Sequence, residues 1–409
     1  MSPLAGKRLC FVVPRYGEAI VGGAERLTRE LALQAAGRGA EVSVFTTCAL
    51  DHSTWSNVLQ PGVEAEAGVT VERFEVDARD SDVWVPLQLA ISRGENLSVE
   101  DQLRWMASSV NSRTLYAQLA DRGSHYDALF FAPYLFGTTF WGSQIHPERS
   151  FLIPCLHDES YAYLPVIAVM FRTVAGCICN ALPEADLVRR LYGSVRCVDV
   201  GMGFELGSSE SPAAPYFEER FPYIVYLGRK ETGKNVHLLI DLFCSGKDRG
   251  WIPDDVRLVI AGGGNFSDLE RPAALARSDV IDLARVEESE KASLLSNCVA
   301  LCQPSVNESF SIVLMEAWQH EVPVLVHANC SVTKYHVVES NGGAYFSNAQ
   351  DFAAAVCVMH ESADLRRHLG KAGREYVSRE YNWEAVMQRF ERGYLELSGR
   401  RQRGMASIL

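Results

Sequence analysis

The sequence predicts an α/β protein built from two doubly wound, Rossmann-like domains that face each other across a cleft. Short apolar runs alternate with longer helix-periodic segments along the chain, which is typical of a parallel sheet wrapped by helices. The chain has 409 residues, which is too long for one ordinary hydrophobic core. Near the middle, Gly201–Gly203 and Gly207–Pro215 interrupt the alternation with the composition of a hinge or linker.

The N-terminal half, residues 1–205, starts with a strand, a loop and an amphipathic helix. Leu9–Val13 is predicted as the strand, Pro14–Gly23 as the loop and Ala24–Gly37 as the helix. One long helix is expected over Ser98–Arg122. Further strands are predicted at Val42–Thr46, Val69–Phe74, Ala128–Phe131, Phe151–Cys155, Cys177–Asn180 and Arg196–Val200.

The C-terminal half, residues 206–380, repeats the alternation after the linker. Strands are predicted at Tyr223–Leu227, Arg257–Ala261, Val280–Leu283, Ala300–Gln303 and Val322–Val326. Helices are predicted at Asn235–Cys244, Glu287–Ser296, Ile312–Gln319, Asp351–His360 and Asp364–Arg379, followed by a last helix at Trp383–Leu397. Ligands of such sheets bind at the carboxyl ends of the strands, so the loops after the strands are the places to look for chemistry.

The net charge of the chain argues against one class of partner. It is -12 at pH 7, so the protein lacks the electrostatic footprint of a nucleic-acid-binding protein. Three arginines near the end, Arg400, Arg401 and Arg403, leave peripheral membrane contact open, although a solvated terminus explains them more simply. No apolar run approaches the roughly 20 residues needed to span a bilayer.

The 11 cysteines predict a reducing compartment. Several lie inside apolar runs, where they act as small hydrophobic side chains, and no Cys/His spacing typical of zinc occurs. Residues 1–8 lead straight into a strand, so no signal peptide is expected. We therefore expect a cytoplasmic protein.

The sharpest motif is a pair of carboxylates around a predicted helix start. Glu308 lies in the loop after a buried strand, and Glu316 lies about one turn into the helix. The backbone N–H groups of Ser309, Phe310 and Ser311 are expected at the positive end of this helix. Carboxylates accept hydrogen bonds from sugar hydroxyls, so the pattern suits a sugar nucleotide. The alternative is an ordinary helix with an N-terminal acid and one surface Glu.

A second motif, Gly228–Asn235, follows a strand and precedes a helix. Its Arg229 and Lys234 are spaced to reach one anion, such as a diphosphate leaving group. The spacing differs from that of a Walker A motif. A solvent-facing basic turn is the alternative.

Glycine-rich turns follow two other strands. Gly22 and Gly23 would let the backbone approach a phosphate. A dinucleotide fingerprint is not expected there, because the loop is long and the next strand ends in threonines instead of an acid, which argues against NAD or FAD. In the run Gly262–Gly264, Gly263 is the donor-binding candidate, and a plain tight turn explains the run equally well.

Two polar motifs lie in the N-terminal half. His157 and Asp158 follow a strand, and such a pair binds sugar hydroxyls or assists proton transfer. An Asp158 that caps a helix beside an incidental histidine is an equal alternative. Asp80-Ser81-Asp82 spells the D-x-D of metal-dependent sugar transferases, but its polar surroundings predict a solvated loop.

On these motifs the chain resembles glycosyltransferase family 4, the retaining glycosyl transferases group 1 with the GT-B fold. The most specific element is the Glu-x7-Glu stretch ESFSIVLMEAW, from Glu308 to Trp318. The pattern YLGR…K from Tyr226 to Lys234 and the GGAE loop add to it. The resemblance implies that residues 381–409 cross back onto the N-terminal domain.

The resemblance also implies roles for individual residues. Arg229 and Lys234 would hold the donor pyrophosphate, and Glu316 would bind the ribose hydroxyls. Glu308 would contact the transferred sugar near the reacting carbon. The other donor contacts would come from His157, from the backbone N–H groups of Phe310 and Ser311, and from Gly22 and Gly23.

The implied reaction is the retaining transfer of a hexose-type sugar from a UDP-, GDP- or dTDP-sugar to an acceptor hydroxyl. Two cations serve the leaving group, so no metal and no cofactor are expected. The acceptor is expected to be a sugar, a lipid-linked glycan or a small molecule, selected by the loops Asp51–Gly68 and Asp77–Ser98. Many family members carry Phe-Gly where this chain has Phe310-Ser311, and the added side chain is expected to narrow the sugar pocket. Two alternatives stay open: a nucleotide-sugar 2-epimerase and a catalytically silent glycosyltransferase-like partner.

Overall fold

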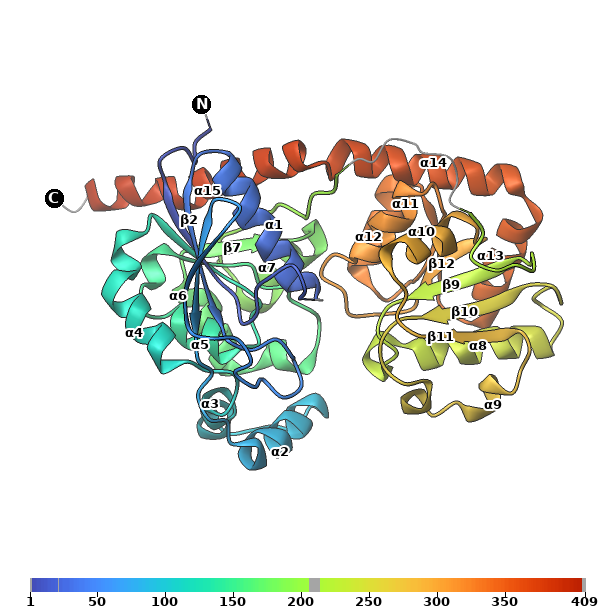
Figure 1. Ribbon diagram of the computed structural model, residues 1–409, viewed down its shortest axis with the longest axis horizontal. Coiled ribbons are helices and arrows are strands. Elements are labelled where there is room, and N and C mark those ends of the chain that lie inside the picture. The colour runs from blue at the N-terminus through green and yellow to red at the C-terminus, as the bar shows by residue number, and fades with distance from the viewer. Residues whose placement is uncertain (1, 21, 206–213, 407–409) are drawn as a thin grey trace. The chain divides into compact units, whose positions relative to one another are not determined.

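The structure is a computed structural model that describes residues 2–20, 22–205 and 214–406. The chain forms two compact units, one of Met1–Gly203 with Trp383–Leu409 and the other of Phe204–Asn382. Each unit is an α/β layer structure, with helices packed around a sheet that is parallel apart from β3 in the N-terminal unit (Figure 1). Most of the predicted linker, residues 206–213, lies outside the described residues.

The N-terminal unit contains one twisted sheet. Its strands are β1 (Arg8–Val12), β2 (Glu41–Thr47), β3 (Gly62–Glu66), β4 (Val69–Phe74), β5 (Ala128–Phe131), β6 (Ser150–Leu152), β7 (Gly176–Cys179) and β8 (Cys197–Asp199). They lie in the order β3-β4-β2-β1-β5-β6-β7-β8, and β3 is antiparallel to β4 while the other pairs are parallel. The winding changes direction between β1 and β5, which is the position where such sheets bind ligands.

The helices of this unit cover the sheet and include the last helix of the chain. They are α1 (Gly23–Gly37), α2 (Ser81–Ser92), α3 (Val99–Ala107), α4 (Arg113–Arg122), α5 (Gly137–Gly142), α6 (Pro165–Thr173), α7 (Leu182–Tyr192) and α15 (Trp383–Ala406). On α15, Phe390 packs 5.3 Å from Phe130 of β5, measured between ring centroids. Glu384 of α15 forms a 2.8 Å ion pair with Arg38 at the end of α1.

The C-terminal unit has the strand order of a Rossmann fold. Its strands are β9 (Tyr223–Leu227), β10 (Arg257–Ala261), β11 (Val280–Leu283), β12 (Ala300–Gln303), β13 (Val324–His327) and β14 (Gly343–Phe346). Its helices are α8 (Val236–Asp248), α9 (Pro272–Leu275), α10 (Glu288–Ser296), α11 (Ile312–Gln319), α12 (Ser331–Ser340), α13 (Ala349–Glu361) and α14 (Ala363–Glu380). The parallel order β11-β10-β9-β12-β13-β14 puts the change of winding between β9 and β12.

The long helix predicted over Ser98–Arg122 is wrong, because polar side chains interrupt it between α3 and α4. Asn111 donates from Nδ2 to the carbonyl oxygens of Met106 and Ala107, which end α3. Ser112 then caps α4 by accepting a 3.3 Å hydrogen bond from the backbone N–H of Leu115. Such local side-chain bonds compete with helix continuation.

The two segments predicted as loops each contain a regular element. β3 lies within Asp51–Gly68, and its largely exposed side chains had no apolar run to mark it. α2 lies within Asp77–Ser98 and begins after Asp80, whose carboxylate accepts a 3.1 Å hydrogen bond from the backbone N–H of Val83. The first aspartate of the D-x-D sequence is therefore a helix cap.

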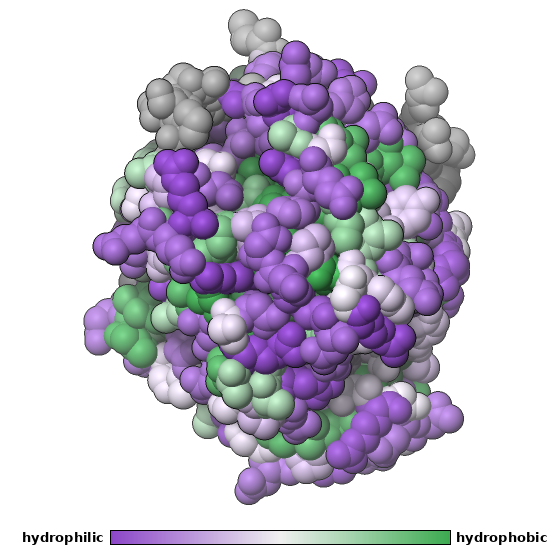
Figure 2. Space-filling view, turned by 90° about the vertical axis from the view of Figure 1, so that its right-hand side faces the viewer, coloured by the Kyte–Doolittle hydropathy of each residue, from purple (hydrophilic) through white to green (hydrophobic). Residues whose placement is uncertain are grey.

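The surface carries no broad apolar area on the face seen in Figure 2. Hydrophilic side chains predominate there, and hydrophobic ones form small, separate patches (Figure 2). Among the residues that the structure describes, no helix combines the length and the apolar character needed to cross a membrane.

Candidate functional site

The loops that follow β9 and β12 leave adjacent strands at the change of winding in the C-terminal unit. β9 pairs in parallel with β12, so both strands end at the same edge of the sheet. The loop after β9 carries Arg229 and Lys234, and the loop after β12 carries Glu308. This is the position where an open α/β sheet offers helix N-termini and loop side chains to a ligand.

Lys234 and Glu308, 74 residues apart in sequence, form an ion pair across these two loops. Lys234 Nζ lies 2.8 Å from Glu308 Oε1, and the side chains are only 23% and 11% exposed. Asn235, which precedes α8, joins the same loops because its Nδ2 donates to the carbonyl oxygen of Pro304 at 3.3 Å. The structure therefore brings the predicted cation and the predicted carboxylate together in a partly desolvated place.

The three cations near the end of β9 have different surroundings. Arg229 is 58% exposed and pairs with Glu231 at 3.1 Å. Lys230 is buried, and its Nζ contacts Asp282 Oδ1 at 2.6 Å and the carbonyl oxygen of Leu283 at 2.7 Å. Lys230 therefore fastens the loop to β11, whereas Arg229 remains accessible to an anion.

The bounds of α11, Ile312–Gln319, are those predicted from the sequence. The helix begins at Ile312, so Ser311 is its N-cap, and Ser309 and Phe310 precede the helix. Phe310 is buried, with its ring centroid 5.3 Å from that of His336 and 5.1 Å from that of Tyr381. Phe310 thus anchors the loop in the core.

Ser311 occupies the left-handed region of the backbone, where glycine is favoured. Its φ is 69°, and its side chain makes no capping hydrogen bond. The residue is 6% exposed, and its hydroxyl is buried without a hydrogen-bond partner within the described part of the chain. The hydroxyl is enclosed by protein, and the effect of this side chain on the sugar pocket stays a prediction.

Ser311→Gly is expected to stabilise the protein by about 1–2 kcal/mol, because it removes the left-handed strain of an L-residue and an unpaired buried hydroxyl. Ser311→Ala removes only the hydroxyl, so it should recover a smaller part of this gain. Thermal and urea unfolding of the two variants measures both contributions. A glycine variant less stable than the wild type would contradict the assignment of strain.

The glycine turn after β10 packs against the loop after β9. A Cβ on Gly262, whose φ is 143°, would overlap the carbonyl group of Gly228. Gly263 accepts a 2.7 Å hydrogen bond from the backbone N–H of Lys230, but a Cβ on it would meet no atom within 4 Å. The turn therefore shapes the Arg229 loop, and Gly262 is the glycine that close packing requires.

In the N-terminal unit, the loop after β1 ends at Gly22, which precedes α1. Gly22 is extended, and a Cβ on it would lie 2.7 Å from the carboxyl carbon of Glu25. Glu25 forms a 2.5 Å ion pair with Arg15, which also donates to the carbonyl oxygen of Leu50 at 3.0 Å. Gly23 is the first residue of α1. The glycines thus lie beside an ordered Arg–Glu pair at the change of winding.

His157 and Asp158 have different partners in the structure. His157 Nδ1 lies 3.6 Å from Glu159 Oε1, which also accepts a 2.8 Å hydrogen bond from the Tyr134 hydroxyl. Asp158 instead accepts hydrogen bonds from the Tyr163 hydroxyl at 2.6 Å and from Arg190 at 2.5 Å. The capping alternative is wrong, because Glu159 is the residue that precedes the following 3-10 turn.

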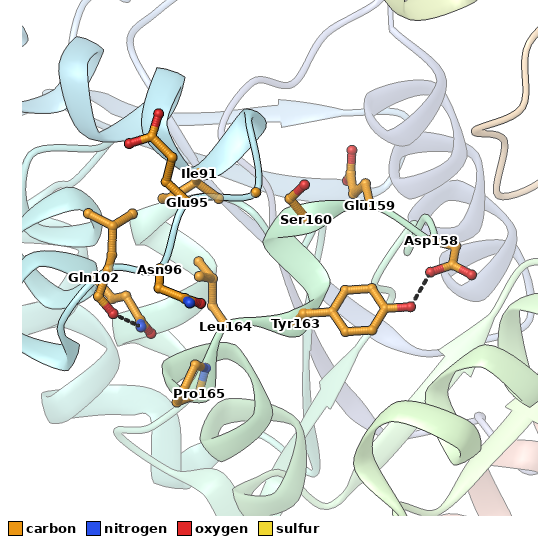
Figure 3. A pocket seen from close by; sticks show the side chains of 12 residues that line it. Ile91, Glu95, Asn96, Gln102, Asp158, Glu159, Ser160, Tyr163, Leu164 and Pro165 are labelled. Carbon is orange, nitrogen blue, oxygen red and sulfur yellow. Dashed lines mark hydrogen bonds between the residues drawn. The ribbon is translucent and has the colours of Figure 1, made fainter.

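A pocket of about 510 Å³ lies beside this segment within the N-terminal unit. Figure 3 shows Asp158, Glu159 and Tyr163 on one side and Glu95 and Asn96, from the turn after α2, on another. The lining thus carries carboxylate, amide and hydroxyl groups, which are hydrogen-bonding partners for a polyhydroxylated molecule.

Glu184 is a buried acid that the sequence did not single out. It is 1% exposed, and its two carboxyl oxygens accept 2.5 Å hydrogen bonds from the backbone N–H groups of Leu156 and Asn180. Glu184 therefore links the segment that contains His157 to the end of β7. Burial raises its pKa from 4.5 to about 8. An acid in the first turn of a helix that follows a strand is the signal that would have found it.

Glu184→Gln is expected to remove a pH dependence of stability. A carboxyl whose folded-state pKa is raised to about 8 contributes stability below its unfolded value of 4.5, and that contribution is lost as the pH rises toward 8. The glutamine has one acceptor oxygen, so the variant should also lose about 1–3 kcal/mol at low pH from an unpaired N–H. Urea unfolding at several pH values between these limits measures both effects. If the free energy of unfolding changed with pH by the same amount in the wild type and in Glu184→Gln, the prediction would be contradicted.

The described residues contain no group of three or more His, Cys, Asp or Glu side chains placed to hold a metal ion.

Residues 208–376 match the family model described as "Glycosyl transferases group 1". The chain is 27% identical over 227 residues to a phosphatidyl-myo-inositol mannosyltransferase of Mycobacterium leprae, covering 53% of this chain and 59% of that protein. It is 26% identical over 194 residues to a D-inositol 3-phosphate glycosyltransferase of Corynebacterium urealyticum, covering 45% of each. The alignments thus span about half to three fifths of these curated relatives.

Solved structures resemble the chain over nearly its whole length. Sucrose-phosphate synthase from Thermosynechococcus elongatus has a TM-score of 0.70 at 17% identity, covering 98% of this chain and 100% of that one. Anabaena HepE, in complex with UDP-glucose, has a TM-score of 0.64 at 14% identity, covering 98% and 99%. These similarities show that the fold is GT-B, which confirms the predicted fold class. Through residues 208–376 of its C-terminal unit, the chain is similar to the glycosyl transferases group 1.

Proposed function

We propose that the protein is a retaining glycosyltransferase that moves a hexose-type sugar from a nucleoside-diphosphate-sugar to an acceptor hydroxyl. The ion pair between Lys234 and Glu308 carries this proposal, because it places a cation and a carboxylate together where a GT-B C-terminal unit offers its loops to a ligand. The names of the relatives, a mannosyltransferase and a glycosyltransferase, support the reaction class. The UDP-glucose in Anabaena HepE supports the class of donor.

In this proposal the C-terminal unit binds the donor. Lys234 and Arg229 stabilise the charge that grows on the diphosphate as the glycosidic bond breaks. Their two positive charges replace the charge that a metal ion would supply, so activity should persist in excess EDTA. Glu308 contacts the sugar near the reacting carbon. The departing diphosphate accepts the proton of the acceptor hydroxyl on the same face, so the anomeric configuration is retained without a protein base.

The N-terminal unit is proposed to bind the acceptor, and the pocket beside Asp158 and Glu159 supports this assignment. The pocket lining in Figure 3 offers acidic and amide groups to hydroxyls. Sugars, lipid-linked glycans and small molecules share such hydroxyls. All 11 cysteines are free, which supports a reducing compartment such as the cytoplasm.

A thermal-shift panel of UDP, GDP, ADP and dTDP tests the donor assignment. One nucleotide should stabilise the wild type, and Arg229→Ala should reduce that shift. Arg367→Ala, at an arginine that is 76% exposed on α14, is the matched control and should leave the shift unchanged. Proton NMR of the transfer product then reads the anomeric configuration. Absence of any stabilisation at about millimolar nucleotide would reject the proposal in favour of a silent partner, and conversion of the donor without acceptor would identify an epimerase.

A further inference from the structure

A second pocket, of about 330 Å³, lies in the C-terminal unit away from the donor loops. Most of its lining comes from residues 215–223, and Asn297, which follows α10, completes it. Tyr223 is the first residue of β9, whereas the loops that carry Arg229 and Glu308 follow the ends of β9 and β12. The pocket is therefore at the opposite edge of the sheet from the candidate donor site.

Aromatic side chains form one wall of this pocket. Phe217 is central, with its ring centroid 4.9 Å from that of Tyr216 and 4.9 Å from that of Phe221. Tyr223 closes the cluster, with its ring centroid 5.6 Å from that of Phe217. Aromatic rings attract one another at these separations in edge-to-face or offset arrangements. Tyr216 and Phe217 stay partly exposed, so the ring of a ligand can join the cluster.

The two charged side chains of the lining have different surroundings. The carboxylate of Glu219 is paired with Arg257, at 3.0 Å and 3.2 Å, and the guanidinium of Arg257 lies 3.9 Å from the ring centroid of Phe221. Arg220 is exposed and forms no ion pair with any residue that the structure describes. Arg220 therefore gives the pocket one uncompensated positive charge beside the aromatic wall.

We propose that this pocket binds a small aromatic anion, with its ring against Tyr216 and Phe217 and its carboxylate or phosphate group at Arg220. A guanidinium pairs with both of these anionic groups through parallel hydrogen bonds. The volume is near the lower end of the range of about 300–1,000 Å³ typical of ligand pockets, so it suits one small ring system and not a chain of sugars. Because the pocket and the donor loops are at opposite edges of the sheet, this ligand and a nucleotide should bind at the same time.

Calorimetric titration with four probes tests the chemical class of the ligand. The probes are 1-naphthyl phosphate, 1-naphthoate, the uncharged 1-naphthol, and inorganic phosphate, which has no ring. The wild type should bind at least one of the two naphthyl anions about tenfold more tightly than 1-naphthol and than inorganic phosphate, because only the anions use both the ring contacts and Arg220. The tighter of the two anions shows which anionic group the pocket prefers.

Three variants locate the binding. Arg220→Gln should weaken binding of the preferred anion about tenfold and leave that of 1-naphthol unchanged, whereas Arg367→Gln, at the 76% exposed arginine of α14, should change neither. Tyr216→Leu should weaken binding of both ring-bearing probes by a similar factor, about fivefold. Equal affinity of the naphthyl anions and 1-naphthol, or full affinity in Arg220→Gln, would overturn the inference. Loss of binding in Arg229→Ala would also overturn it, by placing the anion at the donor loops.

Discussion

Replacing Lys234 by methionine is expected to lower kcat/KM for sugar transfer by about a hundred- to a thousandfold. Lys234 is a cation at the donor loops, and its Nζ pairs at 2.8 Å with the largely buried Glu308. Without it, the leaving diphosphate loses a preorganised positive charge and Glu308 is left as an uncompensated carboxylate. Initial rates at varied donor concentration measure the effect.

Lys371→Met provides the matched control for this substitution. Lys371 lies on α14, is 71% exposed and pairs loosely with Glu375 at 4.0 Å. Its loss should leave kcat/KM within about twofold of the wild type, since exposed pairs contribute little. A Lys234 variant with circular dichroism and activity like those of the control would show that the pair with Glu308 has no part in transfer.

Gly262→Ala is expected to destabilise the C-terminal unit by about 3 kcal/mol or more. The φ of Gly262 is 143°, and the new Cβ would lie 2.7 Å from the carbonyl carbon of Gly228 while overlapping its oxygen. The obstacle is backbone of the neighbouring loop, so no side-chain rotation relieves it. Because that loop carries Arg229, donor binding should weaken together with stability.

Gly263→Ala tests the same turn one residue later. A Cβ on Gly263 meets no atom within 4 Å, so this variant should unfold within about 1 kcal/mol of the wild type. Urea unfolding of both variants measures the loss of stability, and nucleotide titration then measures the loss of donor binding. Equal stability of the two alanine variants would contradict the close approach of the β9 and β10 loops.

Local sequence was sufficient for most strands that surround the candidate site. Three strands are observed with the predicted bounds: Tyr223–Leu227, Arg257–Ala261 and Ala300–Gln303. Each is a short apolar run, which is typical of a strand buried inside a parallel sheet. α12, in contrast, was missed. Its sequence, Ser331–Ser340, contains three valines and a threonine, which favour strands in isolation. Packing of its His336 against Phe310 shows how tertiary contacts override that preference.

The residues of the candidate site could be predicted from the sequence, but the contacts between them could not. The types and approximate places of Arg229, Lys234 and Glu308 were readable because they follow strands of an α/β alternation. The pairing of Lys234 with Glu308 was not readable, because it depends on β9 and β12 being neighbours although two strands, β10 and β11, separate them in the order of the chain. That His157 lies closer to Glu159 while Asp158 pairs with Arg190 was not readable either, because it depends on where Arg190 and Tyr134 lie.

The sequence by itself determined the fold class, the two α/β halves and the loops that carry the charged residues, because apolar periodicity and turn residues act over short stretches of chain. Only the tertiary structure decided which charges meet, that Lys230 and Glu184 are buried, and that Ser311 takes a left-handed backbone. Burial and pairing depend on strand order and on side chains distant in sequence, and one linear pattern is compatible with many such arrangements.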